Sequence, residues 1–211
     1  MHTKMKFCGL TRPKDVEIVN GLKPDYIGFV FFPKSKRYVS PEQARQLKSR
    51  LCPEIKAGGV FVNEEPEVIA GLLENGTIDM AQLHGEENQA YVQKLRHLTN
   101  RPILQAFRVD TEGDIQRAER STADFILLDS GAGGTGTTFD WNLLKHVSRP
   151  YFVAGGLGVH NIKNAVETLH PFGVDVSSGI EENGVKDPIK MQKFADLVRD
   201  FDEISGCGFD K

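Results

Sequence analysis

The chain is poor in cysteine. Its 211 residues include only Cys8, Cys52 and Cys207, and no two of them form a C-x-x-C pair. An odd and sparse set of this kind is unsuited to a disulfide framework or a zinc site, and it is typical of a reducing compartment. We therefore expect neither disulfides nor cysteine-bound zinc.

Long apolar runs are also missing. Residues 1–10 lack the apolar core, about 7–15 residues long, of a secretory signal. The most apolar stretch, Tyr26–Phe32, is far too short to cross a bilayer. We expect a cytoplasmic protein with no membrane partner.

No excess of charge of one sign is present. The 26 Lys and Arg residues nearly balance 29 Asp and Glu residues, which gives a formal net charge of −3. A surface that binds nucleic acid usually needs a basic excess, so we expect no nucleic-acid partner. With 39% hydrophobic and 26% charged residues, the chain also differs from disordered, collagen-like and coiled-coil proteins.

What the chain does contain is a series of short apolar runs, most of them followed by a segment with helical spacing. Runs this short and this apolar indicate strands that are covered on both faces, as in a parallel sheet. The predicted strands are Lys4–Cys8, Tyr26–Phe31, Ile55–Val62, Met80–Leu83, Ile103–Arg108, Phe125–Asp129, Tyr151–Ala154 and Val174–Ser177.

Helix signals lie between these runs. Ser40-Pro41-Glu42-Gln43 combines an N-cap, a proline at the first helical position and a glutamine that closes a capping box. Asp187-Pro188 marks the start of a last helix. Between them, Tyr91, Leu95 and Leu98 have the spacing of a buried helical stripe.

Eight strand–helix alternations in 211 residues leave about 26 residues for each unit. Such alternation predicts an α/β fold with a parallel sheet, and eight units close naturally into a (β/α)8 TIM barrel. We expect one domain over residues 1–211. A doubly wound open sheet is the alternative, because the number of strands does not distinguish the two.

The ends of the predicted strands carry small and titratable residues. In a parallel barrel, active sites lie at the C-terminal ends of the strands, so this distribution favours an enzyme. The residues at or just after those ends are Cys8, Gly9, Arg37, Gln82, His84, Arg108, Asp110, Asp129, Gly155, Gly156, Asp175, Ser177, Ser178 and Gly179.

The segment from Gly131 to Gly136 matches G-x-G-x-x-G after a predicted strand. A dinucleotide fingerprint also needs a helix that opens at the glycines and an acidic residue about 20 positions further on. Here the next helix signal begins only near Asp140. We therefore interpret Gly134 and Gly136 as part of a loop that exposes backbone amides to a ligand, with an ordinary surface turn as the alternative.

A phosphate site is predicted from the last two units. Barrels often bind phosphate with the loops after strands seven and eight. Gly155-Gly156 can bring bare backbone N–H groups close to oxygen atoms. Ser177–Glu181 is predicted to start a short helix whose N-terminus attracts an anion. The two loops together favour a phosphorylated ligand.

Cys8 and Asp129 are candidates for an acid–base pair. A thiol acts as a base only as the thiolate, which a nearby cation or helix N-terminus favours. A carboxyl group shielded from water can keep its proton and act as an acid. The alternatives are a small buried apolar role for Cys8 and a cap or salt-bridge role for Asp129.

Two further side chains belong to this group. Arg37 can clamp a carboxylate with two parallel hydrogen bonds, or it can be a solvated loop residue. His84 is expected to make a hydrogen bond at its strand end. The histidines show no H-x-x-x-H spacing, so we expect no metal.

Taken together, the motifs resemble the phosphoribosylanthranilate isomerase family. They extend from the first strand to the last helix in the family's order. The motifs are Lys6-Phe7-Cys8-Gly9-Leu10-Thr11, Gln82-Leu83-His84-Gly85, Leu128-Asp129-Ser130, Gly134-Thr135-Gly136-Thr137-Thr138-Phe139-Asp140-Trp141, Ala154-Gly155-Gly156-Leu157 and Asp175-Val176-Ser177-Ser178-Gly179-Ile180-Glu181. Lys36 departs from the pattern, which has proline before the arginine.

The resemblance implies a TIM barrel of tryptophan biosynthesis that needs no cofactor and acts on a phosphorylated small molecule, as a monomer or a homodimer. The implied reaction is the Amadori rearrangement of N-(5-phosphoribosyl)anthranilate. It further implies that Cys8 is the general base, that Asp129 is the general acid and that Arg37 holds the anthranilate carboxylate. The implied phosphate and ribose contacts are Gly134–Gly136, Gly155, Gly156, Ser177–Gly179 and Asp175, and His84 matches a family motif without an assigned role.

Two alternatives stand beside this one. A related barrel isomerises the aminoimidazole carboxamide ribotide of histidine biosynthesis with a pair of aspartates, and this chain could do so alone or in addition, but Cys8 at the end of the first strand argues against it. A non-catalytic barrel that binds sugar phosphates would need the phosphate loops but not both Cys8 and Asp129.

Overall fold

The computed structural model describes residues 2–129 and 141–206. Its eight barrel strands are β1 Lys4–Cys8, β2 Tyr26–Val30, β3 Lys56–Phe61, β4 Met80–Leu83, β5 Ile103–Arg108, β6 Phe125–Asp129, β7 Tyr151–Ala154 and β8 Gly173–Val176. Five of them have the predicted bounds, and the other three differ by one residue at one or both ends.

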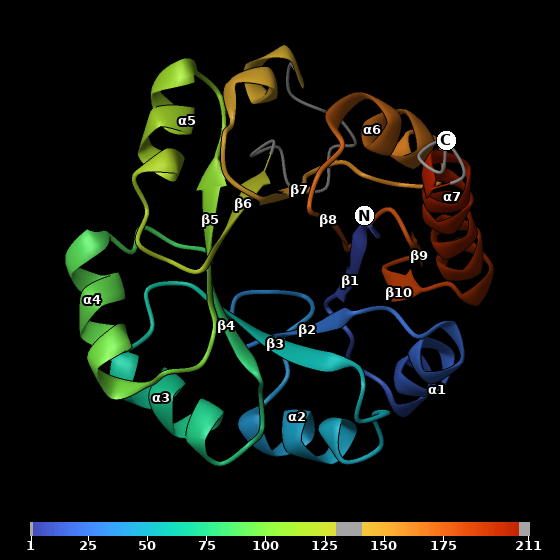
Figure 1. The fold of residues 1–211 in the computed structure, drawn as a ribbon. Coiled ribbons are helices and arrows are strands. Elements are labelled where there is room, and N and C mark those ends of the chain that lie inside the picture. Colours follow the sequence, from blue (N-terminus) through green and yellow to red (C-terminus); the bar gives the residue numbers. More distant parts are fainter. Residues whose placement is uncertain (1, 130–140, 207–211) are drawn as a thin grey trace.

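The strands pair in chain order, each parallel to the next, and β8 pairs with β1 to close the barrel. Figure 1 shows the strands as a ring inside a circle of helices. The predicted (β/α)8 TIM barrel is confirmed, and the open doubly wound sheet is wrong because β1 and β8 are hydrogen-bonded partners.

The outer elements are α1 Pro13–Leu22, α2 Pro41–Lys48, α3 Pro66–Glu74, α4 Gln89–Leu98, α5 Glu112–Glu119, the 3-10 helix η1 Trp141–His146, α6 Ile162–Leu169 and α7 Pro188–Gly206. Within the described residues, none of these helices is long and apolar enough to cross a bilayer.

The helix starts follow the sequence signals closely. The Gln43 amide donates to Ser40 Oγ at 3.2 Å, and the Gln43 side chain accepts from the Ser40 amide at 2.9 Å, as the capping box requires. The predicted stripe of α4 is wrong at one position. Leu98 is 46% exposed because it is the last helical residue, and the buried side chains of α4 are Val92 and Leu95.

Apolar side chains form two layers. The larger layer lies between the strands and the helices, and a smaller cluster of Met80, Leu104, Leu127, Phe152 and Ala154 fills the barrel interior. Four aromatic rings extend this interior cluster at the N-terminal end of the barrel, with centroid distances from 5.4 to 6.1 Å. They belong to Tyr26, Phe125, Phe152 and Phe172.

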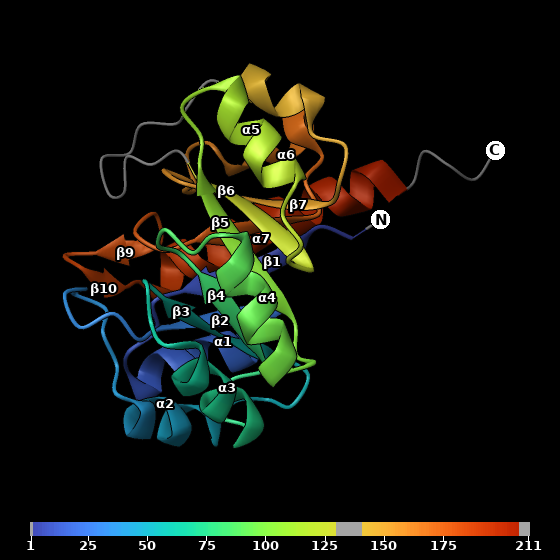
Figure 2. The same cartoon turned by 90° about the vertical axis from the view of Figure 1, so that its left-hand side faces the viewer.

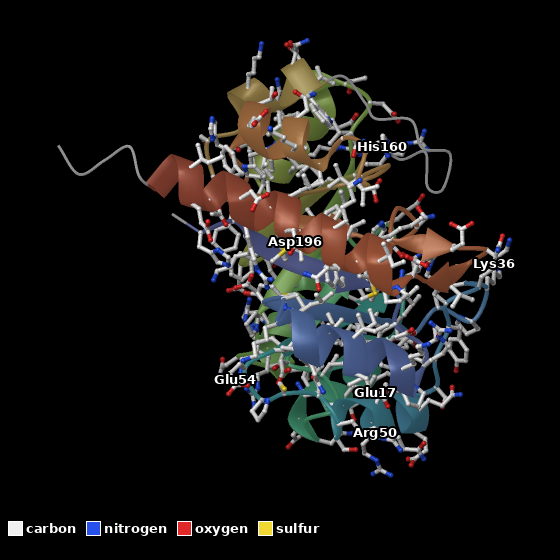
Figure 3. The ribbon with its side chains drawn as sticks, turned by 90° about the vertical axis from the view of Figure 1, so that its right-hand side faces the viewer. Glu17, Lys36, Arg50, Glu54, His160 and Asp196 are labelled. Atoms are coloured by element: carbon white, nitrogen blue, oxygen red, sulfur yellow. The ribbon has the colours of Figure 1, made fainter. Side chains whose placement is uncertain are left out.

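The two ends of the barrel are therefore different. Figure 2 shows a two-stranded hairpin, β9 Glu181–Glu182 and β10 Val185–Lys186, on one side and the start of β1 on the other. At that second end the Thr3 amide donates to both carboxylate oxygens of Asp202 on α7, at 3.1 Å each. In Figure 3, Lys36 lies at the hairpin end and Glu54 at the opposite end.

The hairpin corrects one prediction. Ser177–Glu181 does not start a helix but forms a turn that leads into β9. The physical reason lies in Asn183 and Gly184, which both have positive φ, 50° and 77°. An Asn-Gly pair with these angles is the preferred two-residue connection of a β-hairpin, and it pairs Glu181 with Lys186.

Candidate active site

A cavity of about 370 Å³ opens at the C-terminal end of the barrel. It brings together most of the predicted site residues, whereas Gly134 and Gly136 lie outside the described residues. The predicted residues that line it are Cys8, Arg37, His84, Asp129, Gly155, Gly156, Asp175, Ser177 and Ser178. Gln82, also predicted at a strand end, lines the cavity as well, whereas Gly9, Arg108, Asp110 and Gly179 do not.

Cys8 is the last residue of β1, and its side chain is only 7% exposed. Its partner across the sheet is Gly28 of β2. A Cβ atom on Gly28 would lie 2.7 Å from the Cys8 sulfur, so glycine at this position makes room for the thiol. Ser177 Oγ donates to the Cys8 carbonyl at 3.1 Å and joins the end of β1 to the loop after β8.

Charged side chains surround the thiol. Lys6 precedes Cys8 by two residues on the same face of β1, and its Nζ lies 3.0 and 3.1 Å from the two carboxylate oxygens of Asp175. Burial raises the pKa of the Cys8 thiol, while Lys6 and Lys186 act on that pKa in the opposite direction. Burial disfavours the Lys6 ammonium, but the opposing effects of Asp175 and Cys8 together raise the pKa of Lys6.

Arg37 crosses the end of β1 over Gly9. Gly9 has a φ of 78°, and a Cβ atom there would lie 2.4 Å from Arg37 Cδ. Arg37 donates from Nε and Nη2 to the two carboxylate oxygens of Glu181, at 2.6 and 2.7 Å. Lys186 Nζ donates to the same carboxylate at 2.7 Å.

This pairing uses one edge of the guanidinium group. Among the described residues, Arg37 Nη1 has no hydrogen-bond partner, so the edge formed by Nη1 and Nη2 remains for a second planar anion. Partial burial acts to raise the pKa of Glu181, but hydrogen bonds from Arg37 and Lys186 lower it. Glu181 is therefore an ionised partner of both cations at neutral pH.

Asp129 and His84 face each other across the cavity mouth. His84 Nε2 lies 3.5 Å from Asp129 Oδ2. Gln82 Nε2 lies 2.8 Å from His84 Nδ1 and fixes the orientation of the imidazole ring. The expected strand-end hydrogen bond of His84 is thus present, and it also places His84 beside the candidate acid.

The loops after β7 and β8 lie against each other. Gly155 and Gly156 have φ angles of 84° and 62°, which glycine adopts without strain. Gly158 and Gly179 form an isolated β-bridge between the two loops. A Cβ atom on Gly179 would lie 1.8 Å from the Leu157 carbonyl oxygen, so a side chain at this position would push the loops apart.

Lys6, Lys186 and the role of Glu181 as a charge partner were not predicted from the sequence. Lys6 could have been found from strand alternation: residues two apart on a barrel strand face the same side, and Cys8 was expected to face the interior. A lysine in that position needs a buried carboxylate partner. The Asn183-Gly184 pair was the signal for the hairpin that carries Glu181 and Lys186.

No group of three or more His, Cys, Asp or Glu side chains within residues 2–129 and 141–206 is arranged to hold a metal ion. The polar groups of the cavity are instead paired acids and bases at one end and backbone loops at the other. Such a site suits proton transfer on a small anionic molecule.

Comparisons with known proteins agree with this chemistry. The family model of N-(5'-phosphoribosyl)anthranilate (PRA) isomerase matches residues 5–197. Over 206 residues the chain is 42% identical to the N-(5'-phosphoribosyl)anthranilate isomerase of Clostridium acetobutylicum, covering 94% of this chain and 98% of that protein. It is 43% identical over 200 residues to the same enzyme of Endomicrobium trichonymphae, covering 93% and 98%.

Comparisons with solved structures agree with the sequence comparisons. The phosphoribosylanthranilate isomerase of Thermotoga maritima superposes with a TM-score of 0.86 at 38% identity, covering 94% of this chain and 99% of that one. A phosphoribosylanthranilate isomerase in complex with reduced 1-(o-carboxyphenylamino)-1-deoxyribulose 5-phosphate gives 0.84 at 37% identity, with the same coverage. Another Thermotoga maritima structure is of monomers generated from a dimeric isomerase.

Proposed function

This chain belongs to the N-(5'-phosphoribosyl)anthranilate isomerase family, and from that premise we propose which of its residues carry out the reaction. The chain is an isomerase of tryptophan biosynthesis. It converts N-(5-phosphoribosyl)anthranilate to 1-(2-carboxyphenylamino)-1-deoxyribulose 5-phosphate by an Amadori rearrangement. The relatives are isomerases of the anthranilate compound, which favours this reaction over a histidine-pathway isomerase and over a non-catalytic barrel.

The observation that carries the proposal is that Cys8 and Asp129 line one cavity from different strands. In the first step, Asp129 donates a proton to the furanose ring oxygen. The bond between that oxygen and C1 breaks, and the nitrogen lone pair forms a Schiff base at C1. Asp129 is left as a carboxylate.

In the second step, the Cys8 thiolate removes the proton from C2 of the sugar. The electrons of the C2–H bond form a C1=C2 double bond, and those of the C=N bond return to nitrogen. The resulting enolamine tautomerises to the ketone. A positioned acid or base of this kind typically contributes about 10²–10⁴-fold in rate.

The remaining residues bind the two anionic ends of the substrate. The free edge of Arg37 is suited to the anthranilate carboxylate, since a guanidinium group binds a carboxylate with two parallel hydrogen bonds. The loops at Gly155-Gly156 and Ser177–Gly179 are suited to the phosphate, and Asp175 to the ribose hydroxyls. Gly134 and Gly136, which lie outside the described residues, are also proposed to contact the phosphate.

His84 is proposed to position Asp129. It lies 3.5 Å from the carboxylate and is itself held by Gln82. A rotation of the Asp129 side chain away from the ring oxygen would separate the acid from the atom it protonates.

The test is an anthranilate-fluorescence assay with freshly made phosphoribosylanthranilate. Cys8→Ser and Asp129→Asn are each expected to lower kcat by about 10²–10⁴-fold, while binding of the reduced product analogue persists. Cys52→Ser and Asp110→Asn remove the same functional groups outside the cavity and serve as matched controls. An inactive wild type, or two fully active variants, would refute the assignment.

We also infer that the enzyme works in the cytoplasm, which the sparse and odd set of cysteines supports. Its proposed partner is the phosphorylated substrate. The chain is proposed to act as a monomer or as a homodimer. Sedimentation of the purified chain distinguishes these two states, and fractionation of cells tests the location.

A further inference from the structure

Lys6 is a buried charged residue that the mechanism does not use. The Lys6 side chain is completely buried inside the barrel. Enclosing an ammonium group costs free energy even when a carboxylate compensates it, and an apolar residue of similar size would avoid that cost. Packing alone therefore does not explain the presence of a buried lysine next to a reactive group.

The position of Lys6 is defined on two sides. In the β1–β8 register Lys6 faces Asp175, and the ammonium group lies 3.0 and 3.1 Å from both carboxylate oxygens. Cys8 is the next residue on the same face of β1, so the two side chains are neighbours inside the barrel. The ammonium group is thus held beneath the thiol by a carboxylate that is itself nearly buried.

The other charges around the thiol do not cancel. The groups that face it from neighbouring elements are Lys6 on β1, Asp175 on β8, Lys186 on β10 and Arg37 after β2. Glu181 on β9 binds Arg37 and Lys186 together. Three basic side chains thus face two carboxylates, and a thiolate would bring the cluster closer to neutrality, although burial lowers the pKa of Lys186.

One further charged pair lies across the cavity mouth. Asp129 on β6 and His84 after β4 are within 3.5 Å of each other.

We propose that Lys6 is a positioning residue for Cys8: its ammonium group, oriented by Asp175, supplies positive charge that offsets the effect of burial and favours the thiolate needed to remove the C2 proton. This inference rests on the proposed role of Cys8 as the base. Loss of the thiol proton to solvent balances the step, and no further reactant is required.

Burial raises the pKa of the Cys8 thiol, and Lys6 is the largest influence in the opposite direction, ahead of Lys186. Asp175 acts on that pKa in the same direction as burial. Lys6 and Asp175 must therefore have opposite effects on the thiolate, although they form one ion pair. A purely structural role of the pair would give both substitutions the same sign.

The experiment titrates Cys8 in the full chain. In a Cys52→Ser, Cys207→Ser background, Cys8 is the single thiol, and its rate of alkylation by iodoacetamide is followed from about pH 7 to about pH 11, because burial raises the pKa of this thiol. Lys6→Met is expected to raise the midpoint by about one pH unit or more, which lowers the thiolate fraction about tenfold at a pH below the midpoint. Asp175→Asn is expected to lower the midpoint.

Lys4→Met is the matched control. Lys4 lies on the same face of β1, and its Nζ is 2.7 Å from the Asp25 carboxylate, at the far end of the strand from Cys8. This variant also removes a paired lysine but is expected to leave the midpoint unchanged. Lys186→Met is expected to shift the midpoint of the Cys8 titration less than Lys6→Met does.

An unchanged or lowered midpoint in Lys6→Met would overturn the proposal. If that variant does not fold, the double variant Lys6→Met/Asp175→Asn removes the buried carboxylate as well, and its midpoint is expected above that of Asp175→Asn alone. An equal or lower midpoint would again overturn it. Alkylation requires no turnover, so it separates this inference from the role of Cys8 as base, which fails only if Cys8→Ser remains active.

Discussion

At the scale of single residues, the charged groups of the cavity are paired with one another before any substrate binds. Glu181 holds one edge of the Arg37 guanidinium group with hydrogen bonds of 2.6 and 2.7 Å. Fixing the plane of this group in advance removes rotamer entropy that binding would otherwise have to overcome. The carboxylate of Glu181 is thus a part of the proposed binding site for the carboxylate of the substrate.

Glu181→Gln tests this arrangement. The glutamine keeps the shape of the side chain but cannot accept two charge-assisted hydrogen bonds, so Arg37 should lose its fixed orientation. We expect KM to rise about tenfold with a smaller change in kcat, since one charge-assisted hydrogen bond contributes about 1.5–3 kcal/mol. Steady-state kinetics measure both constants.

The control for that variant is Glu182→Gln, which neutralises the next carboxylate of the same hairpin, where Glu182 pairs with exposed Lys190. It should leave KM unchanged. A lower KM in Glu181→Gln would mean that Glu181 competes with the substrate for Arg37, contrary to the arrangement inferred here.

At the scale of secondary-structure elements, the two loops proposed to bind phosphate depend on close backbone packing. Gly179→Ala would place a Cβ atom 1.8 Å from the Leu157 carbonyl oxygen, and backbone atoms cannot move aside as the end of a flexible side chain can. We expect KM to rise at least about tenfold, because a displacement of about 1 Å in a binding site can cost 10²-fold. Inorganic phosphate should also inhibit the variant less strongly.

Gly71→Ala is the matched control for Gly179→Ala. Gly71 lies within α3, and a Cβ atom there meets no atom within 4 Å. Alanine in a helix is more favourable than glycine by up to about 1 kcal/mol, so this variant should be slightly more stable with unchanged kinetics. Equal kinetics in the two variants would show that the packing of Gly179 against Leu157 does not shape the site.

The start of α5 gives a prediction about pH. Desolvation opposes ionisation of Asp114, but hydrogen bonds from the Asp110 and Thr111 amides, Thr111 Oγ1 and Arg117 lower its pKa to about 2. Since the folded-state pKa is below the unfolded one, the carboxylate stabilises the fold above about pH 4, and this contribution is lost as the pH falls towards about 2.

Asp114→Asn should therefore lower the free energy of unfolding by about 1 kcal/mol at pH 7, the typical contribution of a helix cap. The difference from wild type should shrink steadily on acidification towards pH 2, where the wild-type carboxyl group is protonated too. Urea titrations at several pH values measure it. Glu112→Gln, in the same helical turn, should show no such convergence, and a pH-independent difference for Asp114→Asn would refute the assigned cause.

Some features of these elements could be predicted from the sequence, and others could not. Strand bounds were predictable because apolar runs and helix caps are local signals, and the strand ends then located Cys8 and Asp129. The pairing of Lys6 with Asp175 was not predictable in this way, because it depends on the register between the first and last strands. The hairpin was missed because Ser177–Glu181 was interpreted as a helix start, although Asn183-Gly184 is a local hairpin signal.

At the scale of the whole molecule, the barrel separates stability from chemistry. The interior at its N-terminal end is filled by aromatic rings, and the interior at its C-terminal end by paired charges. Phe152 is central to the first group: it is fully buried, contacts Tyr26, Phe125 and Phe172, and faces Gly173 across the sheet. A Cβ atom on Gly173 would lie 2.5 Å from the Phe152 ring, so this glycine makes room for it.

Phe152→Ala should consequently destabilise the fold without altering the site. Removing a fully buried phenylalanine costs about 3–5 kcal/mol, through lost apolar burial and the cavity left behind. We expect a loss of this size in denaturant unfolding, while KM and the midpoint of the Cys8 titration stay as in wild type under conditions where the variant is folded. The charged residues that set KM and the midpoint lie at the other end of the barrel.

Leu98→Ala is the control for Phe152→Ala, since it truncates an apolar side chain that is 46% exposed and should change stability by no more than about 0.5 kcal/mol. The decisive comparison is between the two ends of the barrel. If Phe152→Ala moved the Cys8 midpoint by as much as Lys6→Met is expected to, the interior would transmit packing changes to the thiol. The effect of the Lys6 charge on the Cys8 midpoint could then not be distinguished from the effect of packing at the aromatic end. An unchanged midpoint in a strongly destabilised variant would instead assign the thiolate to its charged neighbours and the stability of the barrel to its aromatic end.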